Sequence, residues 1–136
     1  MLDDNAVAAL VACAGRAREA AYAPYSGYEV GAAVVAEDER VFFGCNVENA
    51  SYGLSLCAER TAIASAVSAG AKRIRAVVVV TDAEPPGMPC GACRQWLAEF
   101  GDDSMEVVAV NGKGAIQRFT LGQLLPEAFR LESGKQ

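Results

Sequence analysis

The chain opens with apolar residues at the spacing of a helix. Four of them would share one face: Val7, Leu10, Val11 and Ala14. Residues 3–5 read Asp-Asp-Asn, and these residue types favour the N-cap position. Because the residue before a proline disfavours helical backbone, the helix is expected to end before Pro24.

Two β-rich runs follow, over residues 28–36 and 41–47, and the charged segment between them predicts a hairpin. Residues 74–81 contain four consecutive valines bounded by polar residues, which is typical of a strand buried on both faces. Residues 105–110 predict a further strand. Four strand segments are therefore expected.

Two longer helices are predicted over residues 57–69 and 90–100, each followed by a glycine, which often ends a helix. Thr120 and Gln123 have the spacing of a capping box and predict a short last helix that Pro126 stops. The order is helix, two strands, then alternating strands and helices. This order favours a three-layer α/β/α sandwich around a mixed sheet.

Length and charge narrow the class of partner. The 136 residues suit one domain over 1–136, of which 133–136 look like a frayed tail. The formal net charge is −5, and no run of Lys and Arg exceeds Lys72-Arg73, so a nucleic-acid partner is not expected. No segment reaches the roughly 18 apolar residues of a membrane span, and the start lacks the basic region of a signal peptide. A cytoplasmic protein acting on a small molecule is expected.

The absence of histidine removes whole classes of chemistry. Serine-histidine triads, cysteine-histidine pairs and histidine zinc motifs all need an imidazole from the chain. Cys90 and Cys93 form a C-x-x-C at a predicted helix start, which fits a redox dithiol, half of a zinc site or two separate buried thiols. Cys57 also opens a predicted helix and carries Glu59 two residues on.

Three thiolates from Cys57, Cys90 and Cys93 would leave a tetrahedral zinc ion one position for water, as in catalytic sites. A fourth ligand from Cys13 or Cys45 would instead close a structural site, but both are interpreted as core residues. Glu59 is the local group able to move protons. Arg60 and Arg94, next to ligand segments, are placed to donate hydrogen bonds to sulfur.

Two segments together, Cys57-Ala58-Glu59-Arg60 and Pro89-Cys90-Gly91-Ala92-Cys93-Arg94-Gln95, resemble the small homotetrameric class of cytidine deaminases. The wider group of zinc deaminases has an H-x-E and P-C-x-x-C signature, and here cysteine stands at the histidine position. Three further segments support the narrower resemblance: Ala23-Pro24-Tyr25-Ser26, the run from Gly44 to Tyr52, and the run from Leu124 to Phe129.

The resemblance implies a sheet of about five strands, one zinc ion per subunit and a homotetramer whose pockets are shared between subunits. It implies that Asn46 and Glu48 bind the ribose hydroxyls and that Tyr28, at a position usually held by phenylalanine, stacks on the base. Tyr52 and Phe129 match aromatic residues that complete a neighbouring subunit's pocket. The Ala58 N–H, unpaired at a helix start, is placed to hold the 2-oxo group of the pyrimidine.

The expected function is zinc-dependent hydrolytic deamination of cytidine and 2′-deoxycytidine to uridine and 2′-deoxyuridine, with release of ammonia, in pyrimidine salvage. Other interpretations stay open at this point. A deaminase for another cytosine nucleoside such as blasticidin S is the nearest. A C-x-x-C thiol oxidoreductase and a zinc module without catalysis belong to other classes.

Overall fold

A computed structural model describes residues 1–131, so the predicted tail over 133–136 lies outside the described residues. The elements, in chain order, are α1 (Asp4–Arg18), β1 (Gly31–Ala36), β2 (Val41–Cys45), the 3-10 turn η1 (Tyr52–Leu54), α2 (Ala58–Ser68), β3 (Ile74–Thr81), α3 (Gly91–Phe100), β4 (Glu106–Asn111), β5 (Ile116–Thr120) and α4 (Leu121–Leu124).

The strands form one mixed sheet in the order β2-β1-β3-β4-β5. The β3–β4 pair is parallel, and the other three neighbouring pairs are antiparallel. The predicted hairpin is β1–β2, in which Ala33 pairs with Phe43. The β3–α3–β4 crossover carries the chain over one face of the sheet, so α3 begins at the end of the central strand.

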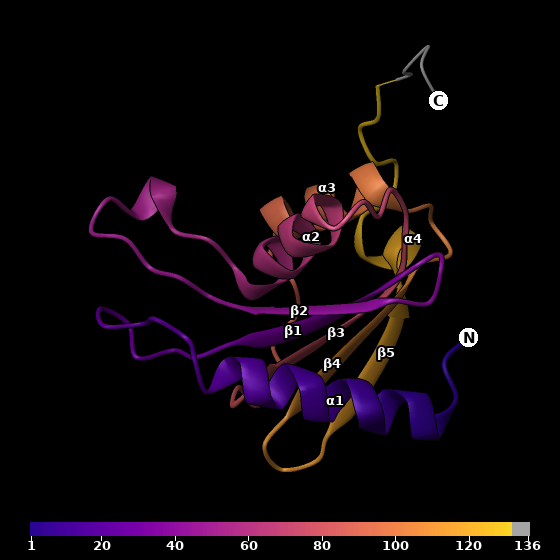
Figure 1. Ribbon diagram of the computed structural model, residues 1–136. Coiled ribbons are helices and arrows are strands. Elements are labelled where there is room, and N and C mark those ends of the chain that lie inside the picture. Colours follow the sequence, from indigo (N-terminus) through magenta and orange to yellow (C-terminus); the bar gives the residue numbers. More distant parts are fainter. Residues whose placement is uncertain (132–136) are drawn as a thin grey trace.

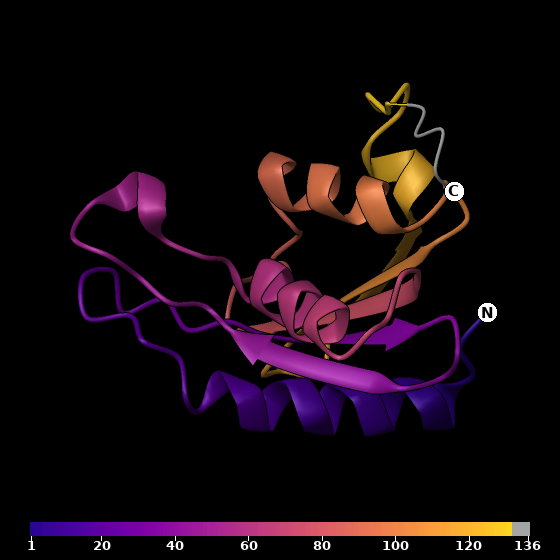
Figure 2. The same ribbon diagram turned by 45° about the horizontal axis from the view of Figure 1, so that its top comes forward.

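Helices cover both faces of the sheet (Figure 1), and α1 lies alone on one of them while α2, α3 and α4 lie on the other. The second view separates the same three layers (Figure 2). The valines of β3 point alternately to two cores. Val77 and Val79 pack with the α2 and α3 side, whereas Val78 and Val80 pack with the α1 side. The predicted sandwich, with its strand buried on both faces, is confirmed.

The first helix has the predicted start. Asp3 is its N-cap, and its carboxylate accepts a hydrogen bond of 2.8 Å from the Ala6 N–H. Val7, Leu10 and Ala14 are buried against the sheet. Within the described residues, no helix is both long and apolar enough to cross a membrane.

Two glycines let helices approach the sheet closely. A Cβ on Gly31 of β1 would lie 1.9 Å from the Ala14 carbonyl oxygen of α1, and a Cβ on Gly44 of β2 would lie 2.7 Å from the Ala62 nitrogen of α2. Any larger residue would push these helices away from the sheet. Gly44 therefore helps to fix where α2 lies, and Cys57 is the N-cap residue of α2.

The sequence pattern does not predict β5. Of its five residues, Ile116, Gln117 and Thr120 are exposed, so no alternation of buried and exposed positions marks the segment. It pairs only with β4 at the edge of the sheet. The predicted hairpin strands were also too long, since residues 28–30 and 46–47 lie outside β1 and β2, and Tyr28, Val30 and Asn46 line a cavity.

Candidate active site

Three cysteine sulfurs meet where α2 and α3 begin. Cys57 and Cys90 are the N-cap residues of these helices, and Cys93 lies in the first turn of α3. The sulfurs of Cys57 and Cys90 are 3.9 Å apart, and all three sulfurs lie within 4.8 Å of one another. Tetrahedral zinc with Zn–S bonds of about 2.3 Å needs sulfurs about 3.8 Å apart. The three predicted ligands are therefore at a spacing that fits zinc.

Cys13 and Cys45 lie outside this cluster. Both are partly exposed free thiols, and Cys13 packs against the core on the α1 side. Within residues 1–131, no fourth His, Cys, Asp or Glu joins the three sulfurs. The closed structural zinc site is thus not formed, and a fourth position stays available for water or substrate.

The cluster favours one thiolate even before a metal binds. A hydrogen bond from the Cys93 thiol and, to a smaller extent, the Arg60 guanidinium together lower the pKa of Cys57 to about 5. The same hydrogen bond and burial raise the pKa of Cys93, because a second negative charge would lie beside the first. Cys57 also stands at a helix N-terminus, where the helix dipole favours negative charge.

Arg60 lies as predicted beside sulfur. Its Nη2 donates to the Cys57 sulfur at 3.4 Å and to the Ser55 carbonyl at 3.3 Å. Its Nε is buried and has no partner among the described residues. A guanidinium here offsets part of the charge of three thiolates around one divalent ion.

Arg94 lies differently from the prediction. Its Nε donates to the Pro89 carbonyl at 2.7 Å and its Nη1 to the Leu124 carbonyl at 2.8 Å. No hydrogen bond among residues 1–131 joins it to sulfur. The backbone carbonyls lie within its reach because α3 and α4 pack together, so Arg94 ties the loop before Cys90 to the last helix.

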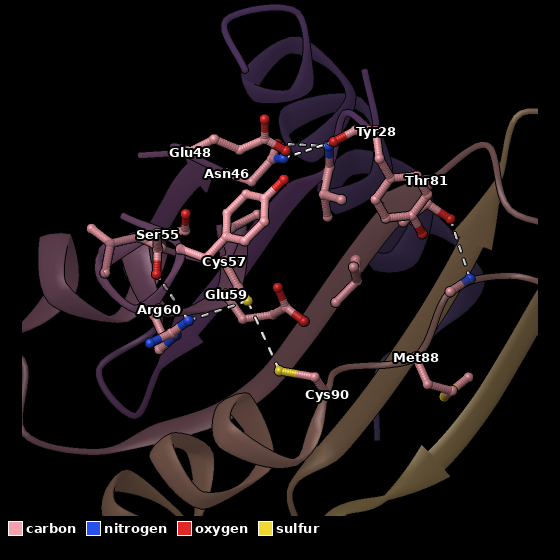
Figure 3. Close-up of a pocket in the computed structure, with 16 residues that line it drawn as sticks. Tyr28, Asn46, Glu48, Ser55, Cys57, Glu59, Arg60, Thr81, Met88 and Cys90 are labelled. Carbon is pink, nitrogen blue, oxygen red and sulfur yellow. Dashed lines mark hydrogen bonds between the residues drawn. The ribbon is translucent and has the colours of Figure 1, made fainter. Parts of the chain in front are cut away.

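Glu59 is the buried acid of the site. Its side chain comes from the first turn of α2, is 4 % exposed and projects into a cavity beside Cys57 and Cys90 (Figure 3). Burial raises the pKa of Glu59 to about 7, and the negative charge of Cys57 acts in the same direction. A carboxyl group with this pKa both accepts and donates a proton near neutral pH.

The cavity has a volume of about 380 Å³, within the range of small-ligand sites. Most of the predicted site residues line it: Tyr28, Asn46, Glu48, Tyr52, Cys57, Ala58, Glu59, Arg60 and Cys90. Cys93 is buried and does not line the cavity, although its sulfur belongs to the cluster. Phe129 is exposed and lies outside the cavity. Sequence reasoning missed the other lining residues, which are Val30, Ser55, Leu56, Val79, Thr81, Gly87 and Met88.

Asn46 and Glu48 leave β2 and face the cavity, and both also hold the backbone across from them. The Asn46 amide donates to the Tyr28 carbonyl at 2.7 Å, and its oxygen accepts from the Val30 N–H at 2.9 Å. Glu48 accepts from the N–H groups of Tyr25 and Ser26 at 3.0 and 3.2 Å. These two side chains are therefore fixed before any ligand binds.

The family model described as the cytidine and deoxycytidylate deaminase zinc-binding region matches residues 5–110. The chain belongs to this family. A curated cytidine deaminase of Sporosarcina psychrophila is 51 % identical over 123 residues, which cover 90 % of each chain. One of Mycobacterium tuberculosis is 43 % identical over 119 residues, covering 88 % of this chain and 86 % of the relative.

Solved structures agree with this assignment. The crystal structure of cytidine deaminase from Burkholderia pseudomallei has a TM-score of 0.87 at 50 % identity, covering 94 % of this chain and all of the other. That of the Mycobacterium tuberculosis enzyme has a TM-score of 0.81 at 41 % identity, with 96 % and 100 % covered. Membership of this family disfavours the redox dithiol and the zinc module without catalysis, and it assigns the three-sulfur cluster to zinc.

Proposed function

We propose that the protein hydrolytically deaminates cytidine and 2′-deoxycytidine to the corresponding uridines and releases ammonia. The observation that carries this proposal is the buried Glu59 carboxylate beside three sulfurs, inside a cavity of nucleoside size. The relatives at 43 to 51 % identity are named cytidine deaminases, which supports the same reaction here.

Substrate binding uses both ends of the cavity. Asn46 and Glu48 offer an amide and a carboxylate to the ribose hydroxyls, and Tyr28 offers its ring to the base. Ala58 begins α2, so its N–H is free of the helix ladder and is available to the 2-oxo group. In the proposed binding mode, carbon 4 of the pyrimidine faces Glu59.

Zinc, when held by Cys57, Cys90 and Cys93, supplies an acidified water as the nucleophile. Glu59 would take one proton of the water that attacks carbon 4 and pass it to ring nitrogen 3 of the pyrimidine. It would then take the second proton from the hydroxyl now on carbon 4 and give it to the amino group. The carbon–nitrogen bond breaks, carbon 4 becomes a carbonyl and ammonia leaves, so one carboxyl group serves both transfers. Burial raises the pKa of Glu59 toward neutral pH, which suits this exchange, and it also limits access of competing water.

The test measures bound zinc and the ultraviolet change on adding cytidine to the same sample. The wild-type protein should hold one zinc per chain and convert cytidine to uridine. Glu59→Gln should keep its zinc and lose at least ~10²–10⁴-fold in turnover, the range for one general acid-base group.

Glu99→Gln is the matched control, since Glu99 is an exposed glutamate on α3 outside the cavity. It should keep wild-type turnover. Zinc-loaded wild-type protein that leaves cytidine unchanged would refute the reaction, and near-normal turnover by Glu59→Gln would refute the role of the carboxylate.

We also propose that the protein is a homotetramer with pockets completed by neighbouring subunits. Tyr52 is 76 % exposed at the cavity rim and Phe129 is 68 % exposed, which are large values for aromatic side chains. The segment that carries η1 extends beyond the sheet (Figure 1). Light scattering coupled to gel filtration should give four times the 14.2 kDa chain mass.

A cytoplasmic location is proposed as well. All five cysteines are free thiols, as expected in a reducing compartment.

A further inference from the structure

The turn over residues 23–27 lies against Glu48. The Gly27 N–H donates to the Ala23 carbonyl at 2.9 Å and closes the turn. The next contacts all go to one carboxylate, since Glu48 Oε1 accepts the N–H groups of Tyr25 and Ser26, and Oε2 accepts the Ser26 hydroxyl. Three hydrogen bonds therefore orient Glu48.

The Ser26 hydroxyl has two partners. Its single proton goes to Glu48, and its oxygen accepts the Tyr28 N–H at 3.0 Å. A serine hydroxyl offers one donor and two acceptor sites, so these bonds use the donor and one acceptor. Ser26 thereby joins the residue expected at the ribose to the backbone of the residue expected at the base.

The same backbone is held from its other side by Asn46, whose amide donates to the Tyr28 carbonyl at 2.7 Å. Both polar side chains of the ribose end thus meet at Tyr28, one directly and one through Ser26. A carboxylate has about four acceptor sites, and the turn occupies three of those on Glu48. One site remains, which is enough for one substrate hydroxyl.

We propose that Ser26 is a positioning residue for ribose recognition, which holds the Glu48 carboxylate so that its remaining acceptor site faces a hydroxyl of the nucleoside. This inference rests on the proposed function. The bonds from Ser26 also lower the pKa of Glu48, which keeps the carboxylate charged and a strong acceptor. Ser26 itself needs no contact with the substrate.

The experiment compares two substrates, cytidine and 2′,3′-dideoxycytidine, which lacks both hydroxyls. Ser26→Ala should lower kcat/KM for cytidine by about tenfold to a hundredfold, the range for a hydrogen bond to a charged group. The loss should appear in KM, with kcat within about threefold of wild type, because ground-state binding is affected. For the dideoxy substrate the loss should be at least about fivefold smaller, since Glu48 has no hydroxyl to bind.

Ser26→Thr keeps a hydroxyl and should restore the cytidine KM. Ser104→Ala is the matched control, because the Ser104 hydroxyl and N–H contact the Asp102 carboxylate in the same way, remote from the cavity. It should leave both substrates unchanged. Thermal unfolding of each variant separates loss of folding from loss of binding.

Equal losses on the two substrates would overturn the inference, because Ser26 would then only support the turn. An unchanged cytidine KM in Ser26→Ala would overturn it too. Both outcomes differ from failure of the proposed function, in which the wild-type protein itself leaves cytidine unconverted.

Discussion

Burial of the Glu59 carboxyl group favours proton transfer but lowers the stability of the folded protein at alkaline pH. Burial in the folded protein raises the pKa of Glu59 to about 7, above the ordinary value of 4.5 for this carboxyl group. Between these two values the folded state binds more protons than the unfolded state, so stability falls as pH rises through this window. The carboxylate that serves proton transfer is therefore a source of instability at alkaline pH.

Zinc-free Glu59→Gln should consequently be more stable than the zinc-free wild type at pH 8, by up to about 3 kcal/mol from the pKa shift. The advantage should shrink toward pH 5, where the folded wild type carries a protonated Glu59. Chemical denaturation at both pH values measures the difference. An equal gain in stability at pH 5 and pH 8 would contradict the proposed dependence of stability on the protonation of Glu59.

Arg60 is a cation in contact with a sulfur of the cluster, through its 3.4 Å hydrogen bond to Cys57. Arg60→Gln removes this charge and should weaken zinc binding by about 10–100-fold, the usual effect of losing a group that contacts a metal ligand. Competition with a chromogenic chelator measures the affinity. Arg130→Gln is the control, because Arg130 donates to the carbonyls of Ala98 and Gly101 and to Asp103, and it should retain wild-type affinity.

The sequence predicted that Cys57, Glu59, Cys90 and Cys93 would lie together, because each of two helix starts carries two of them. The structure brings the three sulfurs into one cluster, with Glu59 in the adjoining cavity. The hydrogen-bond partners of the side chains around the site could not be predicted from the sequence. Nothing in the chain near Arg94 shows that carbonyls from Pro89 and Leu124 will take its donors, since one of them lies 30 residues away.

At the scale of elements, α2 carries Cys57 and Glu59, and its depth on the sheet depends on Gly44. Gly44→Ala would place a Cβ 2.7 Å from the Ala62 nitrogen. Helix α2 must then shift, and this overpacking should lower the free energy of unfolding by about 1–3 kcal/mol. Turnover of cytidine should also fall, because Cys57 and Glu59 move with the helix. Thermal unfolding and the cytidine assay report the two effects.

Gly15→Ala is the matched control within α1, where an added Cβ meets nothing within 4 Å. It should raise stability by about 0.5–1 kcal/mol, since alanine loses less backbone freedom in a helix. Unchanged stability and turnover in Gly44→Ala would show that α2 can shift without cost.

The alternation of strands and helices predicted the sandwich because buried elements carry strong apolar patterns, as the valines of β3 do. The edge strand β5 carries none, since its pairing with β4 and not its own burial keeps it in the sheet. The ends of β1 and β2 were overestimated for a different reason. Beyond the strands only one backbone bond joins Asn46 to Val30, from the Asn46 N–H to the Val30 carbonyl at 3.2 Å, and the Val30 N–H donates instead to the Asn46 side chain at 2.9 Å.

For the whole molecule, zinc binding and proton release are coupled. The raised pKa of Cys93 means that this thiol holds its proton at neutral pH in the zinc-free protein. Zinc must displace it, so the apparent affinity should rise as pH rises, by about tenfold per unit for each proton displaced. Chelator competition at pH 6, 7 and 8 measures the slope, and an affinity independent of pH would contradict it.

Cys57 and Cys90 are 33 residues apart, with β3 between their two helices. An unfolded chain must close this long loop to bring their sulfurs together, whereas Cys90 and Cys93 are always neighbours. During refolding, two thiols should therefore capture zinc early and the third only after β3 enters the sheet. Coordination of zinc by all three sulfurs should therefore report that β3 has joined the sheet and that the centre of the sheet is complete.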